Sequence, residues 1–199
     1  MVGAEAVVRK TRFLSRDCVV KNRIRKNYRV RQLDELLRKM RTKNEARLLH
    51  KAKAAGVLCP TVLCVEDFSI TMTFITGKRP KMDARLSKKA GEYLALLHNN
   101  SIVHGDYTPA NLLKAKNNLF VIDFGLGFFS NDVEDFAVDV FTMLKAIDQK
   151  RHKDFLEGYS KCAKYNAVIK RLGDISSRMR YGGSSLFARG NLSLGKQSL

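Results

Sequence analysis

The sequence lacks the features that mark a membrane-spanning, secreted or zinc-binding protein. No apolar run reaches about 18 residues, and the N-terminus has no charged head followed by an apolar core, so we expect no membrane span and no secretory signal. The four cysteines form no C-x-x-C pair and have no histidine at zinc-finger spacing, which predicts reduced thiols. We therefore expect a cytoplasmic or nuclear protein.

Acidic residues are also scarce in this chain of 199 residues: 19 Asp and Glu face 37 Lys and Arg, a formal net charge of +18. The excess is uneven, because residues 9–53 hold 17 basic and 4 acidic side chains whereas residues 101–140 hold 2 basic and 6 acidic ones. Such a surplus favours a polyanionic partner, either nucleic acid or an acidic protein, with a merely solvated face as the alternative. With 45% apolar residues the chain can bury a core, as one domain or as two lobes that share a cleft.

Local patterns predict strands and two helices in the first part of the chain. We expect a turn and strand at residues 3–10, a second strand that ends at Lys21, and a strand pair within residues 61–77. Thr42 and Glu45 have capping-box spacing and predict the start of a helix. A preceding helix is indicated by an apolar stripe that we expect to pack in the core, formed by Leu33, Leu36, Leu37 and Met40.

Glycine and proline breaks predict a boundary between an N-terminal lobe of residues 1–78 and a C-terminal lobe of residues 79–180. In the second lobe, apolar stripes predict one helix before residues 103–113, one after them, and another over residues 155–175. The first two stripes are Leu86, Tyr93, Leu94 and Leu97, and Phe136, Val140, Leu144 and Ile147. Residues 181–199 are rich in Gly and Ser, and we expect a flexible tail there.

The stretch VHGDYTPANLL gathers polar residues that could form no more than a turn between two buried segments. Its His104, Asp106 and Asn111 follow the order H-x-D-x-x-x-x-N, and Asp123 comes twelve residues after Asn111 within Asp-Phe-Gly. The two motifs match the catalytic loop and the metal-binding turn of the protein-kinase superfamily. Phosphoryl transfer depends on positioning and charge neutralisation, which carboxylates and an amide oxygen can supply.

Each polar residue then has a predicted role. We expect Asp123 to coordinate Mg²⁺ on the phosphates of ATP, and Asn111 to offer its amide oxygen to a second ion. Asp106 is expected to accept a proton from the attacking hydroxyl or water, or to orient it. His104 and Asp139 are expected to support the loop structurally rather than to react.

The phosphates also need a cation and a covering loop. Lys21 is the predicted cation and Glu45 its ion-pair partner. Glu45 could instead serve only as the helix cap, and Lys21 could be merely solvated, with Lys26 as its nearest rival. Gly3 supplies a single glycine where kinases usually have G-x-G-x-x-G, and we expect it to let the backbone approach a phosphate of ATP.

Six segments together resemble the small atypical kinase of the KEOPS complex, the p53-related protein kinase family, which is related to RIO kinases. They are GAEA, VVKNRIRKNYR, LDELLRKMRTKNEARLL, HGDYTPANLL, VIDFGLGF and EDFAVDVF, within residues 1–180. The resemblance implies an α+β fold, a minimal bilobal protein-kinase-like structure with a small N-lobe sheet and a mainly helical C-lobe that lacks a full activation segment. It also implies ATP and Mg²⁺ as cofactors.

The resemblance further implies a function and partners. Family members act as an ATPase, and in isolation as a Ser/Thr kinase, and support threonylcarbamoylation of adenosine 37 in tRNAs that read codons starting with A. The implied partners are a Kae-type transferase subunit on the C-lobe, a small KEOPS subunit on the N-lobe, and tRNA on a basic surface. That surface would contain Arg23, Arg25, Lys26 and Arg29. The dense basic tail of the family is absent, so its role is not carried over.

Two departures from ordinary kinases favour control by a partner protein. Gly105 replaces the arginine of H-R-D, which ordinarily pairs with a phosphorylated activation loop. Only nine residues separate Gly125 from Asp135, with no A-P-E motif, so an ordinary activation segment has no room.

Three other functions remain open. The chain could be an autonomous Ser/Thr kinase that acts on acidic proteins, or a pseudokinase that only binds RNA and protein partners. Small-molecule phosphotransferases share the H-G-D-x-x-x-x-N loop, although they generally need a larger helical insert than this chain has room for.

Overall fold

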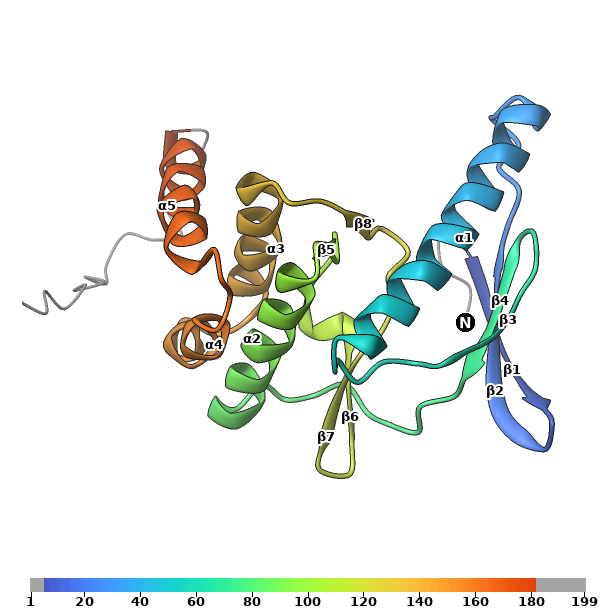
Figure 1. Cartoon of the computed structure of the whole chain (residues 1–199), viewed down its shortest axis with the longest axis horizontal. Coiled ribbons are helices and arrows are strands. Elements are labelled where there is room, and N and C mark those ends of the chain that lie inside the picture. The colour runs from blue at the N-terminus through green and yellow to red at the C-terminus, as the bar shows by residue number, and fades with distance from the viewer. Residues whose placement is uncertain (1–5, 182–199) are drawn as a thin grey trace, which may run out of the picture.

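The N-terminal part of the chain is an antiparallel sheet of four strands. The computed structural model describes residues 6–181 (Figure 1). The strand order is β1-β2-β4-β3, and every neighbouring pair is antiparallel. The strands are β1 (Ala6–Phe13), β2 (Arg16–Arg23), β3 (Val62–Val65) and β4 (Ser69–Thr73). The predicted strands are confirmed, and β2 lies inside the sheet between β1 and β4, which gives Lys21 a rigid support.

One long helix, α1 (Arg31–Ala54), replaces the two helices that were expected before the second strand pair. The capping-box prediction is wrong, because Thr42 lies within the helix and donates its hydroxyl proton to the Arg38 carbonyl. No glycine or proline interrupts residues 31–54, so the helix continues through the expected boundary.

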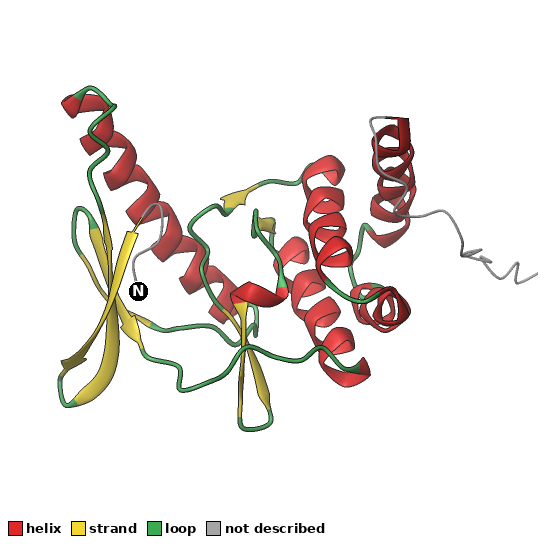
Figure 2. Cartoon of the chain, turned by 180° about the vertical axis from the view of Figure 1, so that it is seen from behind, coloured by secondary structure: helices red, strands yellow, loops and turns green. Residues whose placement is uncertain are grey.

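The apolar stripe at the start of α1 does not pack in the core, contrary to the prediction. Leu33, Leu36 and Met40 are 50%, 56% and 57% exposed. The first turns of α1 extend past the edge of the sheet (Figures 1 and 2), and the face that carries this stripe is exposed there. The opposite face of the helix carries the buried residues, among them Glu45, Leu48 and Leu49.

The rest of the described chain is mainly helical (Figure 2), as predicted. Four helices and two short 3₁₀ turns alternate with short strands, and both predicted stripes are buried. The elements are α2 (Ala84–Asn99), β5 (Ile102–Val103), η1 (Pro109–Asn111), β6 (Leu112–Ala115), β7 (Asn118–Val121), β8 (Phe128–Phe129), α3 (Val133–Ala146), η2 (Gln149–Arg151), α4 (His152–Tyr159) and α5 (Tyr165–Tyr181). Strands β6 and β7 form a hairpin between the two motifs.

The single helix expected over residues 155–175 is two helices, α4 and α5. The side chain of Asn99 replaces helical bonds between them: its amide nitrogen donates to the Lys161 carbonyl, and its oxygen accepts from the Ala163 backbone N–H. A polar side chain from α2 therefore stabilises the turn that separates the helices.

The sheet and the helical part meet near the predicted boundary. Lys78 and Lys114 exchange two backbone hydrogen bonds, of 3.0 and 2.8 Å, which tie the connecting segment to the β6–β7 hairpin. The division at residues 78 and 79 stays a prediction. The predicted tail, apart from Tyr181 at the end of α5, lies outside the described residues, as does Gly3.

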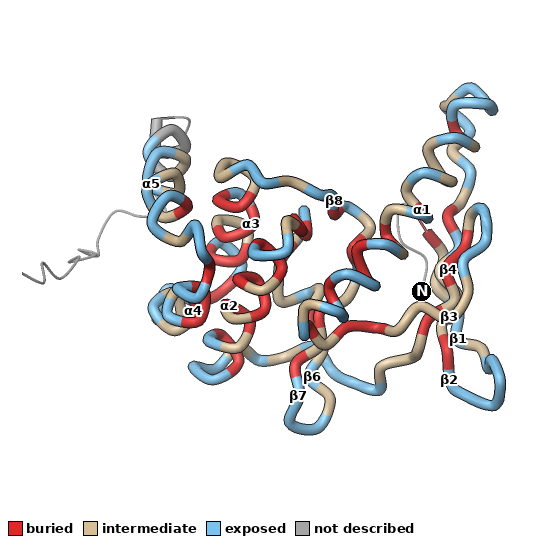
Figure 3. The backbone as a smooth tube through the Cα atoms, in the orientation of Figure 1, coloured by how far each residue is buried: buried red, intermediate tan, exposed pale blue. Residues whose placement is uncertain are grey.

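Buried positions gather where α2, α3 and α4 meet and along the second half of α1 (Figure 3). Within the described residues, no helix is long and apolar enough to cross a membrane.

Helices α2 and α4 approach each other so closely that two glycines are required at their contact. A Cβ atom on Gly158 would lie 1.9 Å from the Lys88 carbonyl oxygen, and one on Gly91 would lie 2.0 Å from the Phe155 carbonyl oxygen. Since both opposing atoms belong to the backbone, a side chain could be accommodated only if the helices moved apart.

We expect Gly158→Ala to destabilise the fold by about 3 kcal/mol, because overpacking forces these helices apart. Urea unfolding followed by circular dichroism would measure the change. Gly173→Ala is the matched control, since a Cβ there meets no atom within 4 Å and lies in helix α5. In the Gly173→Ala control, the free energy of unfolding should stay the same or rise by up to about 1 kcal/mol. Equal stability of the two variants would contradict the close packing of α2 on α4.

Candidate active site

Three predicted site residues from distant parts of the sequence meet at the ammonium group of Lys21. The Nζ atom donates to Oε1 of Glu45 at 2.6 Å and to Oδ1 of Asp123 at 2.7 Å. Lys21 comes from β2, Glu45 from α1, and Asp123 from the segment after β7. The predicted Lys21–Glu45 ion pair is therefore present, and it links the sheet to the loop that carries Asp123.

A second cation, which the sequence interpretation misplaced, binds the same glutamate. The Arg23 guanidinium donates to Oε2 of Glu45 at 2.6 Å, and the Arg23 side chain is only 4% exposed. Arg23 was expected on the basic surface with Arg25, and this is wrong because its side chain is buried. It lies two residues after Lys21, hence on the same face of β2, and that spacing could have indicated a shared partner.

The charges at Lys21 and Asp123 stabilise each other. Burial acts to lower the pKa of Lys21, but the carboxylates of Glu45 and Asp123 outweigh it, and the pKa of Lys21 is raised. Burial acts to raise the pKa of Asp123, but the Lys21 ammonium outweighs it and lowers that pKa. At neutral pH both groups are therefore charged, as ligands of phosphate and metal must be.

Asp106 and Asn111 form a connected pair on the predicted catalytic loop. The Asn111 side-chain N–H₂ donates to Oδ2 and to the backbone carbonyl of Asp106, both at 2.8 Å. The Ile122 backbone N–H donates to the Asn111 carbonyl at 2.9 Å, which holds the residue before Asp123 against the loop. Asp106 and Asn111 thus form one hydrogen-bonded unit, to which the segment that carries Asp123 is attached through Ile122.

The oxygen atoms of this unit fit a Mg²⁺ ion bound together with a nucleotide. Because the Asn111 nitrogen donates to Asp106, its amide oxygen can face a cation, and Asp123 offers a carboxylate. Among the described residues, no group of three or more His, Cys, Asp or Glu side chains could hold a metal by itself. Mg²⁺ commonly takes one or two protein oxygens and completes its shell with phosphate oxygens and water, so this small donor set is adequate.

Asp139 supports the catalytic loop through hydrogen bonds to its backbone, and Nε2 of His104 lies 3.1 Å from the Ile122 carbonyl oxygen. Asp139 accepts from the backbone N–H groups of His104 at 2.6 Å and Gly105 at 2.9 Å. A further residue, which the sequence interpretation did not single out, approaches Asp139: Nε2 of His98 lies 3.4 Å from its Oδ2, and Nδ1 of His98 lies 2.7 Å from the Tyr159 hydroxyl. Burial lowers the pKa of both histidines, which favours their neutral forms.

Gly105 is required on steric grounds, in addition to the regulatory reason inferred from the sequence. Its φ is +78°, and a Cβ atom would lie 2.4 Å from the Leu126 carbonyl oxygen. The segment after Asp123 therefore passes directly over Gly105, and a side chain would push the two loops apart.

Two further residues, Lys26 and Gly3, were considered for the phosphate site. The backbone N–H of Lys26 donates to Asp34 at the start of α1, whereas Glu45 lies about three turns further along the same helix. The structure therefore favours Lys21 over Lys26 as the ion-pair partner of Glu45. Gly3 lies outside the described residues.

This fold and this site define a protein-kinase-like phosphotransferase, with a lysine and glutamate pair, a catalytic-loop aspartate and asparagine, and an Asp-Phe-Gly turn. The model of the RIO domain matches residues 7–128. The chain belongs to the RIO-domain family of atypical kinases.

Curated relatives agree with this assignment. A protein of Archaeoglobus fulgidus named as a serine/threonine-protein kinase BUD32 homolog is 42% identical over 188 residues, which cover 90% of this chain and 94% of that protein. A protein of Methanosarcina acetivorans named as a bifunctional tRNA threonylcarbamoyladenosine biosynthesis protein is 38% identical over 193 residues. This chain spans only 35% of that second protein.

Solved structures confirm the kinase-like fold. The Rio2 kinase of Chaetomium thermophilum, in its complex with ADP, Mg²⁺ and phosphoaspartate, has a TM-score of 0.63 at 14% identity; the match covers 92% of this chain and 70% of that chain. The macrolide 2′-phosphotransferase MphH of Brachybacterium faecium has a TM-score of 0.64 at 12% identity, with 91% of this chain and 82% of that chain covered. The resemblance at this level concerns the fold alone.

Proposed function

We propose that this chain is the ATP- and Mg²⁺-dependent kinase and ATPase subunit of the KEOPS complex, which supports threonylcarbamoyladenosine formation in tRNA. The observation that carries the enzymatic part is the contact of Lys21 with both Glu45 and Asp123. The tRNA part is supported by the names of the relatives, of which the 42% identical kinase is matched over 94% of its length.

Each residue of the site has a proposed role in binding or reaction. Lys21, held in place by Glu45, would bind phosphate oxygens of ATP. Asn111 and Asp123 would hold Mg²⁺, which neutralises charge on the phosphates when it is bound. Asp106, fixed by the Asn111 N–H₂ group, would orient the attacking water or hydroxyl and accept its proton.

The proposed partners take different faces. The exposed stripe of Leu33, Leu36 and Met40 on α1 supports the small KEOPS subunit as the partner of the N-lobe. The Kae-type subunit is proposed for the C-lobe, where the short segment after Gly125 leaves the site open to control by a partner. For tRNA we retain Arg25, Lys26 and Arg29 and remove Arg23, which is buried.

The test is threonylcarbamoylation of tRNA reconstituted from purified partners, with and without this chain. We expect omission of the chain to lower the rate of modification at least about tenfold, and readdition of the wild-type chain with ATP and Mg²⁺ to restore it. Phosphate release and phosphate incorporation into acidic peptides, measured side by side, distinguish an ATPase from the alternative, an autonomous protein kinase. A purely hydrolytic enzyme releases phosphate and labels no peptide. Modification that proceeds equally well without the chain would refute the proposal.

A further inference from the structure

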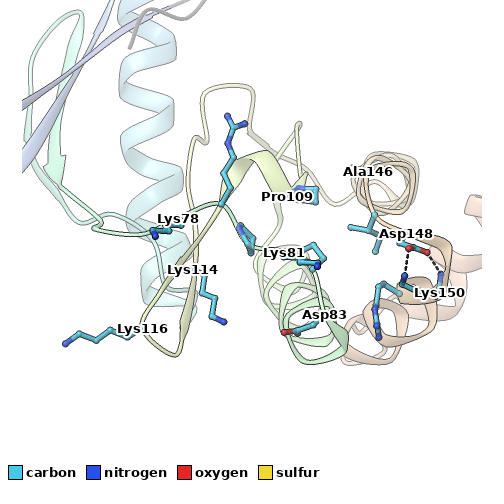
Figure 4. Close-up of a pocket in the computed structure, with 14 residues that line it drawn as sticks. Lys78, Lys81, Asp83, Pro109, Lys114, Lys116, Ala146, Asp148 and Lys150 are labelled. Carbon is cyan, nitrogen blue, oxygen red and sulfur yellow. Dashed lines mark hydrogen bonds and ion pairs between the residues drawn. The ribbon is translucent and has the colours of Figure 1, made fainter.

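A groove with a strongly cationic lining lies beside the catalytic loop, on a different surface from the basic residues of the N-terminal third. Its volume is about 900 Å³. It is formed by the segment before α2, the β6–β7 hairpin, Pro109 of η1, and the α3–α4 connection (Figure 4). Pro109 lies between Asp106 and Asn111 in the sequence, so an occupant of the groove would contact the loop that carries both.

The cations of the groove greatly outnumber its carboxylates, and most of them have no carboxylate partner. Five make no ion pair within the described residues: Lys78, Arg79, Lys81, Lys114 and Lys116. The two carboxylates of the lining are already engaged. Asp83 caps α2 by accepting from the Leu86 N–H at 2.8 Å, and Asp148 pairs with Lys150 at 2.8 Å. The groove therefore carries uncompensated positive charge.

The backbone holds two of these lysines side by side. Lys78 and Lys114 are directly opposed in an antiparallel bridge, so their side chains project from the same face. Like charges in directly opposed positions are destabilising, and a bound anion would relieve that repulsion. These two lysines of the groove are thus held in place by the connection between the sheet and the helical part.

We propose that this groove binds an acidic segment of a polypeptide. The lining offers Pro80, Met82, Pro109 and Ile147 as an apolar floor between the cations. It contains no Phe, Tyr, Trp or His side chain, the rings on which the bases of single-stranded nucleic acids commonly stack. In Figure 4, Lys114 and Lys116 project from the hairpin, Asp148 and Lys150 lie on the opposite side, and Lys81 lies between. Carboxylate side chains along an extended peptide fit this arrangement.

The test is binding of a short fluorescent peptide of Glu and Asp to the full chain without nucleotide, followed by anisotropy. We expect the wild type to bind this peptide, to ignore a Gly and Ser peptide of equal length, and to bind more weakly as salt increases. Lys114→Glu combined with Lys116→Glu should weaken binding about tenfold or more. Lys81→Glu should also weaken binding of the peptide. Because Lys81 lies on a different segment, a local defect of the hairpin could not explain that result.

Lys170→Glu on α5 is the matched control, because it makes the same charge change at an exposed lysine outside the groove. It should alter peptide affinity by no more than about twofold. Unchanged circular dichroism must accompany each variant. Equal binding by wild type and both groove variants would overturn the proposal. So would single-stranded RNA of matched charge that binds more tightly than the peptide and loses affinity in the same variants, which would make the groove a nucleic-acid site. Because no nucleotide is present, these outcomes do not depend on the proposed ATPase.

Discussion

Asp123→Asn is expected to lower ATP hydrolysis and phosphate transfer by about 10²–10³-fold while the protein stays folded. The substitution keeps the size of the side chain but removes the charge that pairs with Lys21 at 2.7 Å and that would hold Mg²⁺. Steady-state phosphate release at saturating ATP would measure the loss. Since the Asp123 side chain is 54% exposed, its loss of charge leaves no buried ion unpaired and should cost little stability.

Asp67→Asn provides the control for this experiment. Asp67 also pairs with a lysine, Lys39, at 2.8 Å, and is 56% exposed, but it lies on the turn between β3 and β4. The Asp67→Asn variant should hydrolyse ATP at the rate of the wild type. If Asp123→Asn retained activity comparable to Asp67→Asn, the assignment of the Asp-Phe-Gly turn as the metal site would be wrong.

Glu45→Gln is expected to cost about 3–5 kcal/mol of unfolding free energy and to abolish ATP hydrolysis. The two oxygens of Glu45 bind Lys21 and Arg23, and its side chain is 2% exposed. A neutral amide would leave the buried Arg23 guanidinium without its carboxylate, and removal of one partner from a buried pair carries a cost of this size. Urea unfolding gives the stability change, and phosphate release gives the activity of the folded fraction.

Glu35→Gln tests whether burial is the reason for the large loss of stability expected of Glu45→Gln. Glu35 pairs with Arg31 on the same helix, but the two side chains are 42% and 77% exposed. Its removal should cost about 0.5 kcal/mol or less, because exposed ion pairs contribute little. Similar unfolding midpoints for Glu45→Gln and Glu35→Gln would contradict the view that Glu45 organises the site.

The choice of phosphoryl acceptor does not follow from the fold. A Rio2 kinase and a macrolide phosphotransferase align with this chain at nearly the same TM-score, 0.63 and 0.64. The look-alike phosphotransferases considered from the sequence thus share the architecture. The 42% identity to the Archaeoglobus kinase, over almost the full length of both chains, is what distinguishes the families.

Much of the local structure follows from the sequence because it depends on neighbouring residues. The short apolar runs of β2 and β4 and the stripes of α2 and α3 are short-range patterns, and each formed the element it predicts. Errors arose where a distant group decided the outcome. The turn between α4 and α5 depends on Asn99, some sixty positions earlier in the chain. The stripe of α1 has a regular helical pattern, but the face that carries it is exposed.

The sequence by itself determined the order of the candidate site residues: Asp106, Asn111 and Asp123 carry motif spacings that do not require a structure to recognise, whereas Lys21 and Glu45 were expected with alternatives. Only the tertiary structure decided that Glu45 serves two cations, that Arg23 is buried, and that Gly105 lies under the Leu126 carbonyl. It also brought together the lysines of the groove, from segments more than thirty residues apart. The physical reason is that charge and sterics act through space, and the pattern of a sequence reports only which groups are available.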